Sequence, residues 1–195
     1  MTRPSAKSAI VLVAALNLGY FCVELGVALA IGSVSLLADS IDFLEDTSIN
    51  ALILAGLAWT AAARARLGRA LALVILMPGL AALWTAWQKL GAPLPPAALP
   101  LTIAGGGALA VNLTCARVLA RYRHGAGSLM KAAFLSARND VLANIAIIVA
   151  GLTTAWIWHS AWPDLIVGLG IAALNAGAAL EVWEAATREG DEAEA

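Results

Sequence analysis

The stretch LLADSIDFLEDTSINALILAGL, residues 36–57, decides the fold class, because it carries acidic residues inside an otherwise apolar segment. Asp42 and Asp46 lie four residues apart in it, and Asp140 lies in a second apolar segment, SARNDVLANIAIIVAGL, residues 136–152. Ionisable groups are costly within a membrane and usually mark an ion or proton pathway. These three carboxylates therefore indicate where function resides in a membrane-spanning chain.

The composition of the chain is that of a membrane protein. Of its 195 residues, 61% are hydrophobic and 13% are charged, whereas a soluble domain is about 45–50% apolar and about 25% charged. The net charge is −1 and the sequence has no basic patch with interleaved aromatic residues, so nucleic acid is set aside as a partner. Two cysteines are too few for a disulfide framework, and we expect Cys22 and Cys115 to be small buried hydrophobic residues.

Six apolar segments are long enough to cross a bilayer, which takes about 20 mostly apolar residues. We expect an all-α membrane protein with a six-helix transmembrane domain over residues 1–187 and an acidic disordered tail over residues 188–195. The expected spans are residues 8–31, 34–61, 70–90, 98–120, 131–158 and 162–186.

The basic residues predict the orientation of these spans. If six spans alternate, every Lys and Arg except Lys89 falls on one side of the membrane. That set comprises Arg3, Lys7, Arg64, Arg66, Arg69, Arg117, Arg121, Arg123, Lys131, Arg138 and Arg188. Positively charged residues favour the cytoplasmic side. We therefore expect a multi-pass protein of the cell membrane with both termini in the cytoplasm.

The polar residues of two spans fall on single helix faces, because residues four apart share one side of a helix. These stripes are Asp42, Asp46 and Asn50 on the second expected span, and Ser136, Asp140 and Asn144 on the fifth. Three ionised carboxylates in a low dielectric repel one another, so protons or a cation must neutralise them. Carboxylate, hydroxyl and amide oxygens suit divalent cations. The pattern favours a cation site, with protonated, helix-bridging Asp residues as the alternative.

Three patterns in the chain resemble the motifs of a known family. Asn17, Phe21 and Glu24 form N-x-x-x-F-x-x-E, the run 32–46 reads G-S-x-x-L-x-A-D-x-x-D-x-x-x-D, and the run 133–140 reads A-F-L-S-x-x-x-D. Together with the run 162–168 at the start of the sixth span, they resemble the cation diffusion facilitator family over residues 10–186. In that family position 42 is His or Asp, and position 136 is usually His.

The resemblance implies a secondary transporter that exports a divalent metal cation, usually zinc, from the cytoplasm in exchange for protons. It implies a homodimer in the lipid bilayer, no enzyme activity and no cofactor besides the transported metal. By position the ligands would be Asp42, Asp46 and Asp140, with Ser136 in the place of the usual histidine. Family members usually carry a cytoplasmic metal-binding domain after the sixth span, and this chain resembles short members that lack it.

The ligand set implied by the resemblance contains no imidazole. Zinc commonly takes nitrogen or sulfur ligands, so an all-oxygen site is expected to select zinc less strictly, and manganese, iron and cobalt are candidate substrates as well. Asn139 or Asn144 would add an amide oxygen, Asn50 lies on the Asp46 stripe, and Asp39 would guide ions to the site.

Two other functional classes remain as alternatives. One is a cation channel or a purely structural membrane protein. The other is an intramembrane aspartyl protease, which two membrane Asp residues suggest. The protease is less favoured, because Asp42 and Asp46 lie on one helix and the sequence around them has no Gly-x-Gly-Asp-like motif.

Overall fold

The computed structural model describes a bundle of helices. The described residues are 6–56, 60, 63, 66–67, 69–70, 80, 82–90, 94–121, 127–173, 183–184 and 187–188, and their side chains are described except at 6, 56 and 127–139. Within these residues every regular element is a helix and no strand occurs. The expected all-α class is therefore confirmed for this part of the chain.

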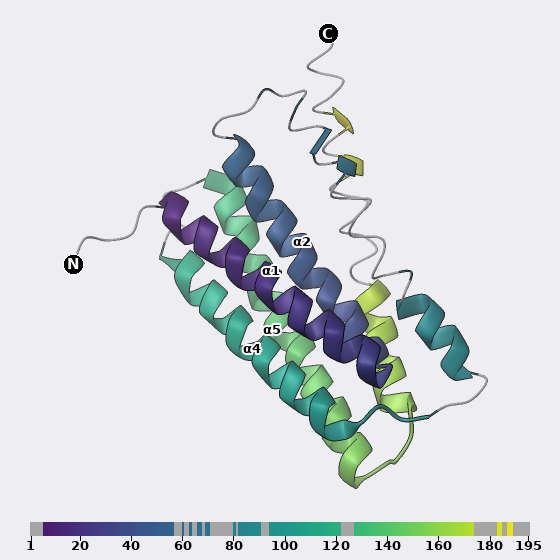
Figure 1. Ribbon diagram of the computed structural model, residues 1–195. Helices are drawn as coiled ribbons and strands as arrows, with labels where there is room; N and C mark the ends of the chain where they lie inside the picture. Colours follow the sequence, from purple (N-terminus) through teal and green to yellow (C-terminus); the bar gives the residue numbers. More distant parts are fainter. Residues whose placement is uncertain are drawn as a thin grey trace.

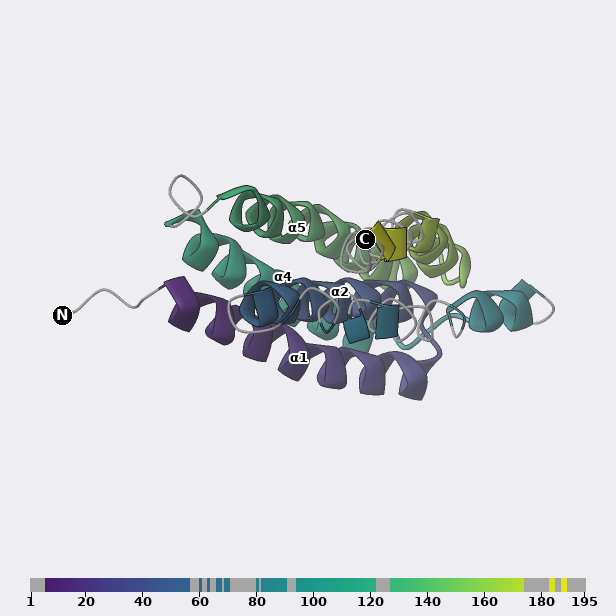
Figure 2. The same cartoon turned by 90° about the horizontal axis from the view of Figure 1, so that it is seen from above.

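Four long helices form the body of the bundle. They are α1 (Ala6–Ile31), α2 (Val34–Gly56), α4 (Ala98–Ala120) and α5 (Gly127–Trp156). Helix α1 packs against α2 and α4, and α5 packs against α4 and α2. Seen from above, α1 and α5 lie on opposite sides of the bundle with α2 between them (Figure 2). Any polar side chain that points from α2 into the bundle therefore meets other helices.

Two shorter helical segments lie at one end of this bundle. They are residues 82–90 and Trp162–Ala173, and both lie near the turn that joins α1 to α2 (Figure 1). We refer to this as the Gly32 end, after the glycine in that turn. In the proposed orientation the Gly32 end faces away from the cytoplasm.

Two of the described helices are long and apolar enough to cross a membrane. Lys7–Ile31 has a mean hydropathy of 2.0, and Ala98–Ala120 has a mean hydropathy of 1.4. Helix α2 is similar in length but carries four acidic residues, the three of its motif and Glu45. The division into six spans and the orientation of the termini stay predictions. Parts of the expected spans 34–61, 70–90 and 162–186, and most of the tail 188–195, lie outside the described residues.

The turn between α1 and α2 depends on a glycine. Gly32 has φ 62°, a left-handed conformation that is accessible mainly to glycine. It ends α1 in a Schellman arrangement, in which the N–H of Ser33 donates to the carbonyl oxygen of Ala28 at 3.0 Å. Ser33 then caps α2, because its Oγ accepts the N–H of Leu36 at 3.1 Å. The Gly-Ser pair of the sequence motif thus ends one helix and begins the next.

A buried carboxylate from a distant helix completes the start of α2. Asp164 is fully buried and accepts the N–H groups of Val34 and Ser35 at 2.8 and 3.1 Å. It also accepts the hydroxyls of Ser33 and Ser35, both at 2.6 Å, and pairs with Lys89 Nζ at 3.4 Å. A negative charge at a helix N-terminus is stabilised by the free N–H groups and the helix dipole. We call Asp164 and these four partners the Asp164 clasp.

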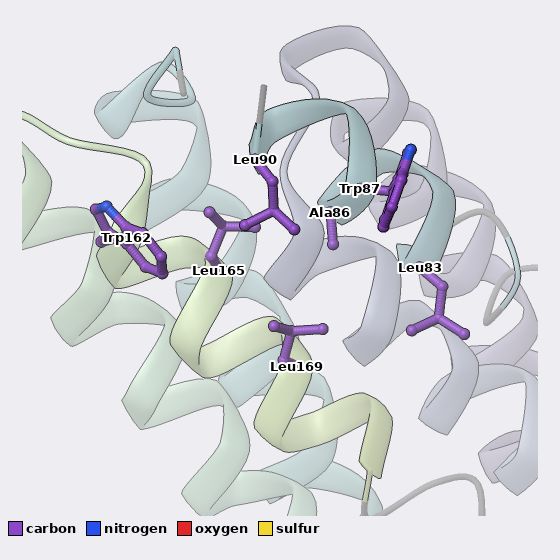
Figure 3. A pocket seen from close by; sticks show the side chains of 7 residues that line it. All are labelled: Leu83, Ala86, Trp87, Leu90, Trp162, Leu165 and Leu169. Atoms are coloured by element: carbon purple, nitrogen blue, oxygen red, sulfur yellow. The ribbon is translucent and has the colours of Figure 1, made fainter. Parts of the chain in front are cut away.

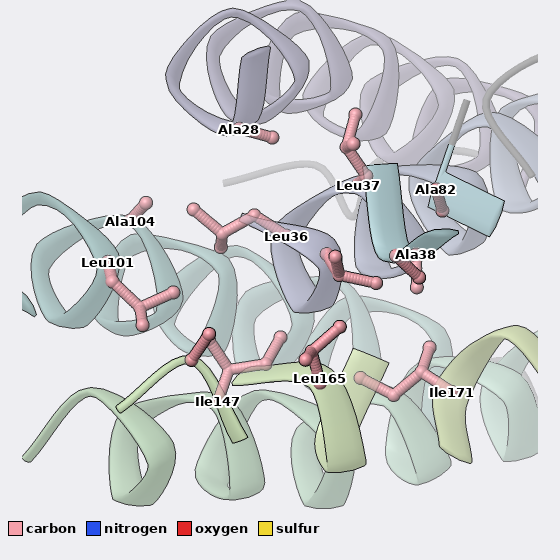
Figure 4. Packing of buried hydrophobic residues seen from close by; sticks show 13 residues of the cluster. Ala28, Leu36, Leu37, Ala38, Ala82, Leu101, Ala104, Ile147, Leu165 and Ile171 are labelled. Carbon is pink, nitrogen blue, oxygen red and sulfur yellow. The ribbon is translucent and has the colours of Figure 1, made fainter. Parts of the chain in front are cut away.

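An apolar core closes the same end of the bundle. Leu36 and Leu37 from α2 pack with Leu101 of α4, Ile147 of α5 and Leu165 (Figure 4). All five side chains are buried. The clasp and this core together join α2, α4, α5 and Trp162–Ala173 at the Gly32 end.

Candidate metal-binding site

The structure brings together the three carboxylates that the sequence pattern singles out. Asp42 and Asp46 lie on the side of α2 that faces the bundle and are buried. Asp140 is partly buried on α5 and interacts electrostatically with both of them. Asp42 and Asp140 are about a hundred residues apart in the sequence. The packing of α2 against α5 therefore brings them together.

The three carboxylates are neighbours but do not form a closed ligand set. In the part of the chain that the structure describes, no three His, Cys, Asp or Glu side chains are close enough to hold one metal ion together. A metal that bound all three would therefore have to draw α2 and α5 closer. The side chains of Ser136 and Asn139, two further predicted site residues, lie outside those described.

Asp46 is held by a hydrogen bond from α1. Asn17 Nδ2 donates to Asp46 Oδ2 at 3.2 Å, and Cys115 Sγ on α4 donates to Asn17 Oδ1 at 3.4 Å. The thiol therefore fixes which side of the Asn17 amide faces the carboxylate, since the amide oxygen is already occupied. The other predicted supporting residue on this stripe, Asn50, donates to the backbone oxygen of Asp46 at 2.7 Å.

The expectation for the cysteines was correct for only one of them. Cys115 is buried, as expected, whereas Cys22 is exposed. Asn17 and Glu24 lie seven residues apart on one side of α1 and are both buried, and Cys22 lies on the opposite side, so the expectation for Cys22 overlooked this polar stripe. Cys115 also does more than fill space, because its thiol orients Asn17.

Two further supporting residues bind each other. Asn144 Nδ2 donates to Asp39 Oδ2 at 2.6 Å, and Asn144 Oδ1 accepts from Asn112 Nδ2 at 3.0 Å. This chain of hydrogen bonds links α2, α5 and α4, and all three side chains are buried. In this conformation both groups of the Asn144 amide are engaged by neighbouring helices.

The structure adds two acidic residues to the neighbourhood of the site. Glu24 on α1 is fully buried beside Asp39. Glu45 is partly buried and interacts electrostatically with Asp42 and Asp140. From the sequence Glu24 was recognised only as a motif position, because nothing in its spacing shows which residue of α2 it would meet.

The model of the cation efflux transmembrane domain matches residues 10–189. The chain belongs to the cation efflux family. This is the cation diffusion facilitator family that the motifs resemble. No curated protein sequence matches the chain.

Membership of the cation efflux family agrees with the acidic character of the site. Proteins of this family are membrane transporters of divalent metal cations and not enzymes, which disfavours the protease alternative. The metal is therefore a substrate and not a resident cofactor. The carboxylates on α2 and α5 have the oxygen atoms that divalent cations accept as ligands.

A cavity elsewhere in this cation efflux protein is unsuited to a metal. It has a volume of about 200 Å³ and lies between residues 82–90 and Trp162–Ala173 (Figure 3). Its lining is apolar and includes Leu83, Trp87 and Trp162. A divalent cation needs oxygen, nitrogen or sulfur ligands, so this cavity offers no metal site.

Proposed function

We propose that this member of the cation efflux family exports a divalent metal cation from the cytoplasm in exchange for protons, by alternating access. The observation that carries the proposal is the approach of Asp140 on α5 to Asp42 and Asp46 on α2 within a membrane domain. Carboxylates buried this close need a positive charge to neutralise them. A metal supplies that charge in one state of the cycle, and protons supply it in the other.

In this proposal Asp42, Asp46 and Asp140 are the metal ligands. Ser136, Asn139, Asn144, Asn50 and Asp39 are supporting residues. A ligand set of oxygen atoms suits hard and borderline divalent ions, so the substrate is one of zinc, manganese, iron and cobalt. The protein acts as a homodimer with six spans per chain and cytoplasmic termini in the cell membrane.

The distribution of burial supports a conformation that is closed at the Gly32 end. Asp39 is fully buried, Asp42 and Asp46 are nearly so, and Glu45 and Asp140 are partly exposed. The acidic residue of α2 nearest the Asp164 clasp is thus the most buried, and the partly exposed Glu45 lies farther along the helix. The metal would enter from the more exposed end, which is the cytoplasmic end in the proposed orientation. Release would require the clasp end to open.

The test is metal uptake into proteoliposomes under an imposed proton gradient. Mn²⁺, Zn²⁺, Fe²⁺ and Co²⁺ would each be offered to the wild type and to Asp46→Asn. We expect saturable, gradient-dependent uptake by the wild type and its loss in the variant. A matched control is Glu184→Gln, because the Glu184 side chain is 61% exposed and pairs with Arg188 one helical turn later.

Two results would contradict the proposal. Uptake that persists in Asp46→Asn would show that transport does not need the Asp46 carboxylate. Flux that does not saturate with metal concentration and ignores the proton gradient would identify a channel instead.

A further inference from the structure

Glu24 on α1 and Asp39 on α2 are a pair of buried carboxyl groups outside the predicted ligand set. Both side chains are fully buried, and their carboxyl groups are close enough for a hydrogen bond if one carries a proton. An ionised carboxylate accepts hydrogen bonds but donates none. Two carboxylates that face each other therefore cannot satisfy one another.

The surrounding residues do not supply the missing donors. Among the described residues, neither oxygen of Glu24 and not Asp39 Oδ1 has a hydrogen-bond partner. The nearby hydroxyl of Tyr20 donates to the carbonyl oxygen of Ala104 instead. Asn144 reaches only Asp39 Oδ2. Burial of such a pair is costly unless a positive charge lies between the two groups.

No charged side chain described here provides that charge. Two ion pairs in the described part of the chain, Lys89 with Asp164 and Arg188 with Glu184, include neither Glu24 nor Asp39. Either a proton shared between the two carboxyl groups or a bound cation must therefore neutralise the pair.

The pair lies directly along α2 from the proposed metal site. Asp39 precedes Asp42 by three residues, which is about 4.5 Å along the helix axis toward the Gly32 end. Asp42 interacts electrostatically with Glu24 and Asp39 as well as with Asp46 and Asp140, and Asp39 also interacts with Asp140. The pair and the proposed metal site are therefore electrostatically connected through Asp42 and Asp39.

We propose that Glu24 and Asp39 form a second cation station, which receives the transported metal from the Asp42 level on its way to the Gly32 end. The station rests on the proposed transport function. Its ligand is a divalent cation of the kind that carboxylate oxygens bind.

The first test separates binding from transport with Mn²⁺ as the probe. Purified wild type, Glu24→Gln and Asp39→Asn would be compared with the exposed control Glu184→Gln. We expect Glu24→Gln to bind Mn²⁺ with a Kd within about threefold of wild type, because Asp42, Asp46 and Asp140 are intact, and we expect both station variants to transport more slowly. Their maximal transport rate should fall about tenfold or more, which corresponds to about 1.4 kcal/mol on the barrier.

The second test asks whether metal touches the station. Glu24→His replaces a carboxylate with an imidazole, which zinc accepts more readily than manganese does. We expect the ratio of Zn²⁺ to Mn²⁺ transport to rise at least about threefold over wild type, in line with the higher affinity of nitrogen ligands for zinc. A merely structural role of Glu24 would change the transport of both metals equally.

The outcomes distinguish the station from the function on which it rests. If the wild type neither binds nor transports metal, the proposed function fails. If the wild type transports and both Glu24→Gln and Asp39→Asn transport at its rate, the station is wrong. An equal loss for Zn²⁺ and Mn²⁺ in Glu24→His, with the protein monodisperse, would also overturn it and would leave the pair a structural or proton-carrying role.

Discussion

Asp164 and Glu24 are both fully buried acidic residues of the same helix bundle, yet their surroundings are opposite. Asp164 accepts two backbone N–H groups and two hydroxyls and pairs with Lys89. Neither oxygen of Glu24 has a partner among the described residues. The chain therefore surrounds a carboxylate with donors where it anchors a helix, and provides none where we propose that a mobile cation passes.

Removal of the anchoring carboxylate should have the largest effect on stability. Asp164→Ala leaves Lys89 buried without its partner and exposes the N-terminus of α2, so we expect a loss of about 3–5 kcal/mol. Thermal unfolding in detergent would measure it. The double variant Asp164→Ala with Lys89→Met should recover part of the loss. A single variant as stable as the wild type would show that the clasp is not an anchor.

The next largest loss of stability should come from a substitution at the point where the Trp162–Ala173 helix approaches α2 closely. A Cβ on Gly168 would lie 2.6 Å from the backbone nitrogen of Ser35, whereas a Cβ on Gly170 would meet nothing within 4 Å. Gly168→Ala should therefore cost about 1–3 kcal/mol. Gly170→Ala is the matched control on the same helix. Equal stability of the two variants would mean that the helices do not touch at this point.

Loss of the hydrogen bond from Asn17 to Asp46 should lower the affinity for metal more than it lowers the stability of the fold. Asn17→Ala removes one donor from a proposed ligand, so apparent metal affinity should fall by about threefold to tenfold, or about 1 kcal/mol. Cys115→Ala, which frees the Asn17 amide to turn, should have a smaller effect in the same direction. Cys22→Ala is the control, since Cys22 is exposed. An unchanged KM for Mn²⁺ in Asn17→Ala would contradict this role.

The smallest effect on stability is expected at Glu24. Glu24→Gln removes a carboxylate that has no donor to lose, so the free energy of unfolding should change by less than about 0.5 kcal/mol or rise. The measurement is the same unfolding experiment as for Asp164→Ala. A destabilisation comparable to that of Asp164→Ala would erase the contrast between the two residues.

Part of this arrangement could be predicted from the sequence. The lengths and apolar character of α1 and α4 predicted helices of membrane-spanning length. The spacing of Asp42 and Asp46 placed them on one face of α2, and the family motif brought Asp140 to the same site. These features depend on local spacing or on a pattern shared by a family.

The contacts between helices could not be predicted in the same way. A helix that is apolar on all sides carries no signal for which side faces its neighbours. On α1 the spacing of Asn17 and Glu24 indicates the buried side, opposite Cys22, but it does not show that Cys115 of α4 would meet Asn17. It also did not show that Glu24 would meet Asp39, or that Lys89 would be buried with Asp164 about 75 residues later in the chain.

The Asp164 clasp also constrains the order in which the protein is built. The N–H groups of Val34 and Ser35 receive their acceptor from a residue that lies about 130 positions later. During synthesis the α1–α2 hairpin therefore enters the membrane with the start of α2 still incomplete, and it stays so until the ribosome has passed residue 164. The N–H groups at the start of α2 gain this acceptor only once the Trp162–Ala173 helix has been made. A nascent chain that ends before this helix should therefore insert but not reach its final packing.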